Sequence, residues 1–378
     1  PVAGILHILV YVGFVIINIE VLEIIIDGVL GTHRVFAFAG GLYDILIGSF
    51  EILAFLVLVS VVIFWIRRMV LKIPRFWNKE MTSWPKNDAL NILYFEMVLM
   101  GLFLVMNGAD HALQQMGAIH YASAGSFPIS QYLSGVLPQN ELMLFYIERG
   151  AWWLHIIGIL IFLNYLYYSK HLHILLAFPN TFYGNLAPQG KLDNLESVHK
   201  EVKLMMDPNA DPYAAPEESE EVAGKFGASD VADLNWVQLM NAYTCTECGR
   251  CTSVCPANQT GKELSPRAIM MKTRDRLEEV GKFIDDKDEA TFKEHGDGKS
   301  LLSYISEEEI WACTSCNACV TECPVAIDPL SIIIDLRRYL VMENSAAPQE
   351  LNVMMSNIEN NGAPWPYNQM DRLNWKDE

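Results

Sequence analysis

The sequence predicts an all-α protein, in which a membrane-spanning helical bundle is followed by a smaller helical domain that carries the cysteines. Two observations lead to this fold class. The first 180 residues contain four long apolar stretches, whereas the acidic residues concentrate after residue 190. All eight cysteines lie between residues 245 and 323, so we do not expect a dispersed disulfide framework. The length of 378 residues allows about two or three such domains.

Four stretches are long enough to cross a bilayer, which takes about 20 predominantly apolar residues. They lie at residues 3–26, 46–65, 89–108 and 150–168. Their apolar residues form no amphipathic stripe, as expected for helices that are surrounded by lipid and by one another. The alternative is a soluble protein that contains four buried helices.

Basic residues mark one of the connections between these stretches. Residues 67–86 contain six lysines and arginines, while residues 109–148 contain none. The positive-inside rule therefore places residues 67–88 in the cytoplasm, together with residue 1 and everything after Lys170. Pro1 starts almost directly inside an apolar run without an initiator Met, and we expect the native chain to begin upstream of it.

Histidines lie near both ends of the predicted spans. His155 and His173 are 18 residues apart, which corresponds to five turns and about 27 Å of one continuous helix. Both would face the same side of the last span, an arrangement that suits two stacked b-type haems. We pair His173 with His7 for the cytoplasmic haem, and His155 with His33 or, alternatively, His111 for the outer haem. The simpler alternative is that these histidines only hydrogen-bond to lipid headgroups or backbone.

Four carboxyl groups also lie within apolar stretches, namely Glu20, Glu23, Glu51 and Glu96. Polar groups at such depths are costly and are usually functional. They would carry protons to a quinone or face water near the helix ends, and the sequence does not decide between these roles.

The cysteines form two copies of a C-x₂-C-x₂-C-x₃-C-P run, which begin at Cys245 and Cys313. In two-cluster ferredoxins the first three cysteines of a run bind one [4Fe–4S] cluster, and the fourth reaches across to the other. One predicted cluster therefore has the ligands Cys245, Cys248, Cys251 and Cys323. The other has the ligands Cys313, Cys316, Cys319 and Cys255. Structural zinc would leave thiolates unused, and a cytoplasmic location disfavours disulfides.

The remaining sequence completes the predicted domain organisation. Residues 1–180 form the membrane bundle, 181–232 an acidic linker, 233–345 a helical ferredoxin domain and 346–378 a tail that docks a partner. Within the ferredoxin domain we expect one helix to start at Pro266, capped by Ser265, and a matching helix to start at Pro329. The net charge of −18 argues against nucleic-acid binding. No phosphate loop, catalytic triad or flavin motif is apparent, so the catalytic residues are unknown and substrate chemistry is expected on another subunit.

These motifs carry a family resemblance. His155-x₂-Gly158 followed by Ser169-Lys170-His171-Leu172-His173 resembles the last helix of the nitrate reductase gamma-subunit type of cytochrome b. Fused to the two cysteine runs, it is similar to membrane iron–sulfur proteins related to heterodisulfide reductase and to electron-transfer-flavoprotein:menaquinone oxidoreductases. That cytochrome family has a second histidine ten positions after the residue that matches His7. This chain has Ile17 there, so both one haem b and two haems b remain open.

The resemblance implies an electron-transfer subunit of a larger complex in the bacterial inner (plasma) membrane, with its iron–sulfur domain in the cytoplasm. Its implied partners are lipid, quinone, and a CCG-domain iron–sulfur subunit or an electron-transfer flavoprotein, or both. We expect electrons from the flavoprotein to reduce menaquinone. The alternatives are quinol-driven reduction of a disulfide on a heterodisulfide-reductase-like partner, and a haem-free membrane anchor for a ferredoxin module.

Overall fold

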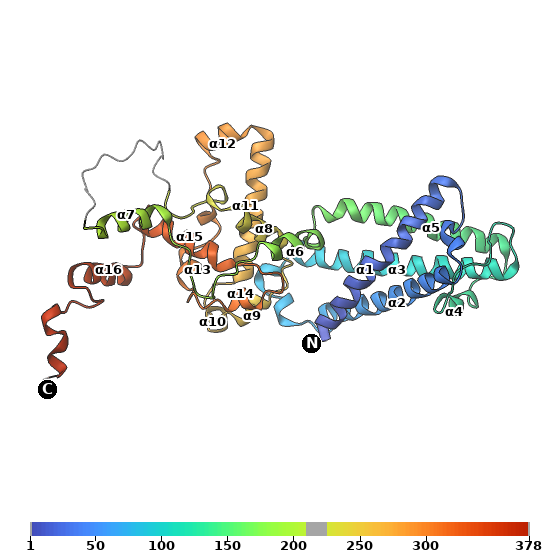
Figure 1. Cartoon of the computed structure of the whole chain (residues 1–378), viewed down its shortest axis with the longest axis horizontal. Coiled ribbons are helices and arrows are strands. Elements are labelled where there is room, and N and C mark those ends of the chain that lie inside the picture. Colours follow the sequence, from blue (N-terminus) through green and yellow to red (C-terminus); the bar gives the residue numbers. More distant parts are fainter. Residues whose placement is uncertain (1, 209–224, 377–378) are drawn as a thin grey trace. The chain divides into compact units, whose positions relative to one another are not determined.

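The computed structural model describes residues 2–208 and 225–376, and its regular structure is helical, as predicted (Figure 1). The chain divides into two compact units, Pro1–Leu172 and His173–Glu378. The predicted linker carboxylates Glu217, Glu218, Glu220 and Glu221 lie outside the described residues. The α-helices of the first unit are α1 (Val2–Leu30), α2 (Gly41–Met69), α3 (Trp84–Met116), α4 (Ser130–Ser134) and α5 (Glu141–Leu166).

Four helices of the first unit, α1, α2, α3 and α5, are long and apolar enough to cross a membrane. They run alongside one another (Figure 1), with α3 packed against both α2 and α5, and α1 packed against α2. Large apolar side chains point outward from these helices, among them Ile8, Leu22, Ile45, Val98 and Leu160. Such an outer surface suits lipid better than water. The last span begins at Glu141 rather than at residue 150, because Asn140 caps it by accepting a hydrogen bond from Met143 N–H.

The end of α5 differs from the prediction. The buried carboxylate of Asp88, on α3, accepts hydrogen bonds from the Tyr165 hydroxyl at 2.6 Å, the Ser169 hydroxyl at 2.7 Å and the Lys170 N–H at 3.1 Å. These bonds hold the chain against α3 and stop α5 at Leu166; a short 3₁₀ helix, Lys170–Leu172, follows. His173 then begins a new helix in the second unit. The prediction that one continuous helix carries His155 and His173 is therefore wrong.

The second unit is a set of short helices around one apolar core. Its α-helices are α6 (His173–Phe182), α7 (Glu196–Met206), α8 (Trp236–Thr244), α9 (Arg250–Val254), α10 (Pro256–Gln259), α11 (Pro266–Asp286), α12 (Glu289–His295), α13 (Glu307–Trp311), α14 (Ala318–Glu322), α15 (Pro329–Met342) and α16 (Gln349–Asn361). As predicted, α11 starts at Pro266 with Ser265 as its cap, and α15 starts at Pro329.

The order of elements in this unit repeats once. In each half a cysteine loop is followed by a short helix and then by a longer one, α9 and α11 in the first half and α14 and α15 in the second; the first half also has the short helix α10 between them. The equivalent elements meet, because α9 packs against α14 and α11 packs against α15. The repeat brings the two cysteine loops to the same part of the domain.

Candidate iron–sulfur and haem sites

The two cysteine loops adopt the same backbone conformation. In the first loop Glu247 and Gly249 have positive φ, of 56° and 74°, and in the second Ser315 and Asn317 have φ of 55° and 59°. Left-handed residues within a tight loop turn backbone N–H groups toward a common centre, which suits an anionic cluster. Glycine and asparagine are the residues that adopt this conformation most easily. One such amide is already directed at sulfur, since Ser315 N–H lies 3.4 Å from Cys313 Sγ.

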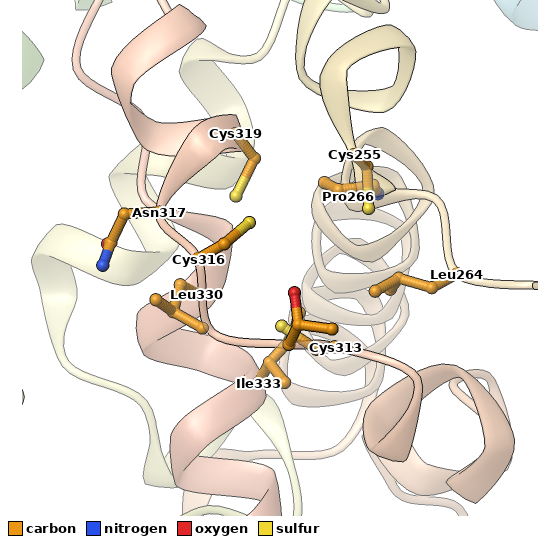
Figure 2. Close-up of a pocket in the computed structure, with 10 residues that line it drawn as sticks. Cys255, Leu264, Pro266, Cys313, Cys316, Asn317, Cys319, Leu330 and Ile333 are labelled. Carbon is orange, nitrogen blue, oxygen red and sulfur yellow. The ribbon is translucent and has the colours of Figure 1, made fainter. Parts of the chain in front are cut away.

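The fourth cysteine of the first run faces the second run. Figure 2 shows one pocket whose wall contains four thiols, those of Cys255, Cys313, Cys316 and Cys319. The rest of the wall is mainly apolar, with Leu264, Pro266, Leu330 and Ile333. A pocket of four thiols in an apolar surround fits a [4Fe–4S] cluster, each iron of which takes one cysteine.

The fourth cysteine of the second run lies near the first run. Cys323 interacts electrostatically with Cys248, and Cys251 interacts with both Cys248 and Cys323. Cys245 interacts with Cys248 and Cys251. Cys251 is also within electrostatic range of Cys319, a residue of the pocket in Figure 2. The eight thiols therefore form two adjoining groups.

The pKa values and the arrangement of the thiols are also consistent with iron–sulfur clusters. Burial raises the pKa of Cys245 and of Cys251 to about 12, and neighbouring thiols add to the shift. Iron–sulfur binding must therefore displace protons from these sulfurs. Among the described residues, no three His, Cys, Asp or Glu side chains gather as they would around a single metal ion. The spread of the thiols suits a four-iron cluster better than one zinc ion.

Charged residues that the sequence analysis did not single out hold both loops. In the second, the Arg337 guanidinium donates to the backbone oxygens of Ile310, at 2.7 Å, and Cys313. In the first, Glu247 is buried and pairs with Arg274 at 3.0 Å. Each arginine lies on the long helix that follows its own cysteine run, α11 or α15. That shared placement is the only sequence signal that could have identified them.

One predicted haem ligand, His155, has the surroundings that an axial ligand needs. It is buried on α5, and its Nδ1 lies 3.0 Å from the backbone oxygen of Leu99 on α3. A proton on Nδ1 that is donated to this carbonyl leaves Nε2 free of a proton and able to bind iron. Helices α3 and α5 lie close together here, as Gly158 shows: a Cβ atom added to this glycine would lie only 2.8 Å from Leu99 Cδ2. His155 is therefore suited to be one of the two protein ligands of a haem iron.

Of the two candidate partners of His155, His111 is on α3 and His33 lies in the connection between α1 and α2, near Asp110 of α3. His155 packs beside Phe103, with ring centres 5.9 Å apart, whereas His33 Nε2 is 3.4 Å from Asp110. Asp110 is seven residues beyond Phe103, which corresponds to about 10 Å along the helix. His111 is beside Asp110 in sequence, and its Nε2 lies 2.9 Å from the Gln115 amide nitrogen. The pairing of His155 with His33 or with His111 stays a prediction.

The other haem pair is divided between the two units. His7 lies on α1 of the first unit, and His173 is the first residue of α6 in the second. Their pairing stays a prediction.

Comparison with known proteins agrees with the two groups of thiols. Residues 244–327 match the family described as 4Fe-4S dicluster domain. The probable iron-sulfur-binding oxidoreductase FadF of Bacillus subtilis (strain 168) is 31% identical over 403 residues, which cover 100% of this chain and 52% of FadF. The EtfAB:quinone oxidoreductase of Syntrophomonas wolfei subsp. wolfei is 24% identical over 406 residues, covering 100% of this chain and 51% of that protein.

A further relative matches a smaller part of the chain. It is a subunit of the dihydromethanophenazine:CoB–CoM heterodisulfide reductase of Methanosarcina mazei, and it is 28% identical over 159 residues, which cover 41% of this chain and 37% of the relative. No solved structure gives a significant match. The chain spans about half the length of the first two relatives. The chain is therefore related to iron–sulfur oxidoreductases, and it contains a domain for two [4Fe–4S] clusters that has eight cysteines.

Proposed function

We propose that this chain is the electron-transfer part of a membrane complex and links a cytoplasmic redox partner to the quinone pool. One observation carries the proposal: two adjoining groups of thiols lie on the same chain as four helices of membrane-spanning length. The similarity to the EtfAB:quinone oxidoreductase of Syntrophomonas wolfei supports an electron-transfer flavoprotein as the electron donor and a quinone, for which we propose menaquinone, as the acceptor. The partner that carries substrate chemistry is a flavoprotein or a CCG-domain subunit.

The cysteines have defined roles in this proposal. Cys245, Cys248, Cys251 and Cys323 hold one cluster, and Cys313, Cys316, Cys319 and Cys255 hold the other. When bound, the clusters and the haem supply carriers that each take one electron at a time. The contacts of Arg337 and Glu247 stabilise the conformation of the two cysteine loops around the clusters.

The histidines complete the proposed membrane site. His7 and His173 would hold a haem b near the cytoplasmic side, and His155 would bind a second haem b toward the outer side, together with His33 or His111. We place the iron–sulfur domain in the cytoplasm, because residues 67–86 contain six lysines and arginines whereas residues 109–148 contain none.

The likeness to a heterodisulfide reductase favours a second candidate. Here quinol would supply the electrons and a partner protein would use them to reduce a disulfide. The residues of this chain would have the same roles in both directions of electron flow.

The test is an optical and electron paramagnetic resonance study of the purified full chain with bound cofactors. A menaquinol analogue is the only reductant, and dithionite is added afterwards. We expect quinol to produce b-haem bands, His173→Ala to lose one haem, and the control His120→Ala, at an exposed loop residue, to keep both the bands and the iron–sulfur signals.

The other outcomes separate the hypotheses. Haem bands with dithionite alone would contradict contact between the haem and the quinone pool. If neither reductant produces haem bands, the membrane unit is a haem-free anchor. If the chain reduces quinone with electrons from an electron-transfer flavoprotein, this result would favour the first candidate over disulfide reduction.

A further inference from the structure

Buried carboxyl groups gather at the end of the membrane bundle that lies away from the basic connection. This end contains the last turns of α1, the start of α2, the last turns of α3 and the start of α5. Six of the carboxyl groups at this end are Glu20, Glu23, Asp27, Glu51, Asp110 and Glu148, and all of these but Asp27 are at most 4% exposed. The basic side chains that line the cavity among them are Arg34, Arg149 and His33. Within the part of the chain that the structure describes, three basic side chains thus stand beside six carboxyl groups, and unpaired charge is costly in a bundle.

Two of the six have an arginine as partner. Asp110 pairs with Arg34 at 2.6 Å. Glu148 pairs with Arg149 and also accepts a hydrogen bond from the Tyr121 hydroxyl at 2.9 Å. Charge-assisted hydrogen bonds of this kind favour the ionised carboxylate. Asp110 and Glu148 therefore each have a basic side chain as partner.

Two more are held by several donors. Glu23 accepts hydrogen bonds from Phe36 N–H and from the Tyr43 hydroxyl, both at 2.9 Å. Asp27 accepts from the N–H groups of Arg34, at 2.7 Å, and Val35, at 3.1 Å. These bonds shape the connection between α1 and α2, and they use both oxygens of each carboxyl group.

Glu20 differs from these four. It is 3% exposed, and its Oε2 has no hydrogen-bond partner in the part of the chain that the structure describes. The charged groups that face it are Glu23 on its own helix, Arg34, Glu51 on α2 and Asp110 on α3. Arg34 is already bound to Asp110. An ionised Glu20 would add a negative charge to a site that has too few cations.

Two other polar atoms in this region are also without partners. Glu51 uses one oxygen to accept the N–H groups of Ile129 and Ser130, but its Oε1 has no partner among the described residues. The amide nitrogen Nδ2 of Asn107, a hydrogen-bond donor, also has no partner among the described residues. Buried polar atoms without protein partners are the atoms that internal water satisfies.

A small cavity is lined in part by the side chain of Glu20. It measures about 30 Å³ and is lined by Glu20, Glu23, Asp27, His33 and Asp110, among others. This volume is enough for about two water molecules. The exposed residue Thr32 also lines it, so the cavity reaches from the connection between α1 and α2 inward to Glu20.

We propose that Glu20 is a proton-exchange site, which is protonated at neutral pH and exchanges its proton with the outer aqueous phase through the water in this cavity. Glu51 lies within electrostatic range and accepts the proton when Glu20 releases it inward. The direction toward the outer phase follows from the positive-inside rule. The proton moves between carboxyl oxygens and water, and no other bond forms or breaks.

The use of this proton rests on the proposed function. Reduction of one quinone to quinol takes up two electrons and two protons, and the clusters can supply only electrons. Glu20 would deliver protons from the outer side during quinone reduction, or release them there during quinol oxidation.

The test is infrared spectroscopy of the full chain in lipid nanodiscs without quinone, so that its result does not depend on the redox function. We expect wild-type protein at pH 7 to show the C=O stretch of a protonated carboxylic acid, and this band to shift within seconds of mixing with D₂O. Glu20→Gln should lose the band. Asp44→Asn is the matched control, because Asp44 is an exposed carboxylate at the same end of the bundle. It should leave the band unchanged.

Three results would overturn the proposal: a band that persists in Glu20→Gln, a band that does not shift in D₂O, or one that disappears when sodium replaces choline in the buffer. The last would assign the site to a metal cation. If Glu20→Gln does not fold, Glu20→Asp keeps the carboxyl group and should retain a displaced band. Failure of the wild-type chain to reduce quinone, with these infrared results as expected, would contradict the proposed function alone.

Discussion

The cross-ligation of the two clusters can be tested by counting iron in single and double variants. Cys323 is 72 residues beyond Cys251 in sequence, yet the two thiols interact. Cys255 lies in the pocket of the other run. We therefore expect Cys323→Ala to damage the cluster that is bound by the first run. Loss of one of two [4Fe–4S] clusters would leave about four of about eight irons per chain.

Double variants give the sharper result. Cys323→Ala combined with Cys248→Ala should lose no more iron than either change alone, because both residues bind the same cluster. Combined with Cys316→Ala, it should remove both clusters and leave about zero iron. The assay is iron and acid-labile sulfide per chain, with electron paramagnetic resonance of the reduced protein. If the first pair removes all iron and the second only half, each run binds its own cluster and the assignment is refuted.

Three further predictions concern single side chains. Arg337→Gln should lower the reduction potential of the cluster near Cys313, because a positive charge is removed; a redox titration in which that potential stays constant would contradict this. His173→Ala should remove one b-type haem from the optical spectrum and leave the iron–sulfur signals intact, and an unchanged haem content would exclude this ligand. Hydrogen bonding from Arg276 lowers the pKa of Asp297 from 3.8 to about 2, so this contact stabilises fully above about pH 4 and less as the pH falls toward 2. Asp297→Asn should therefore lower the free energy of unfolding at pH 7 by about 1–2 kcal/mol, measured by urea denaturation with circular dichroism, and an equal value for both proteins would contradict it.

The sequence predicted those features that depend on local pattern. The four spans follow from runs of apolar residues, and the start of α11 follows from Ser265 and Pro266. The residues that support the cysteine loops could not be found in this way. Arg337 donates to a carbonyl 27 positions earlier in the chain, and Arg274 pairs with Glu247 in the same long-range manner. An arginine on a helix shows no local sign of such a partner.

The end of α5 shows why spacing alone could not place the histidines. Eighteen residues give five helical turns only if the helix is uninterrupted, and no proline or glycine lies between residues 159 and 172 to indicate a break. The break comes from Asp88, a residue of another helix. Its carboxylate accepts three hydrogen bonds from Tyr165, Ser169 and Lys170, and hydrogen bonds to a charged group contribute about 1.5–3 kcal/mol each. A tertiary contact therefore decides where the last span ends.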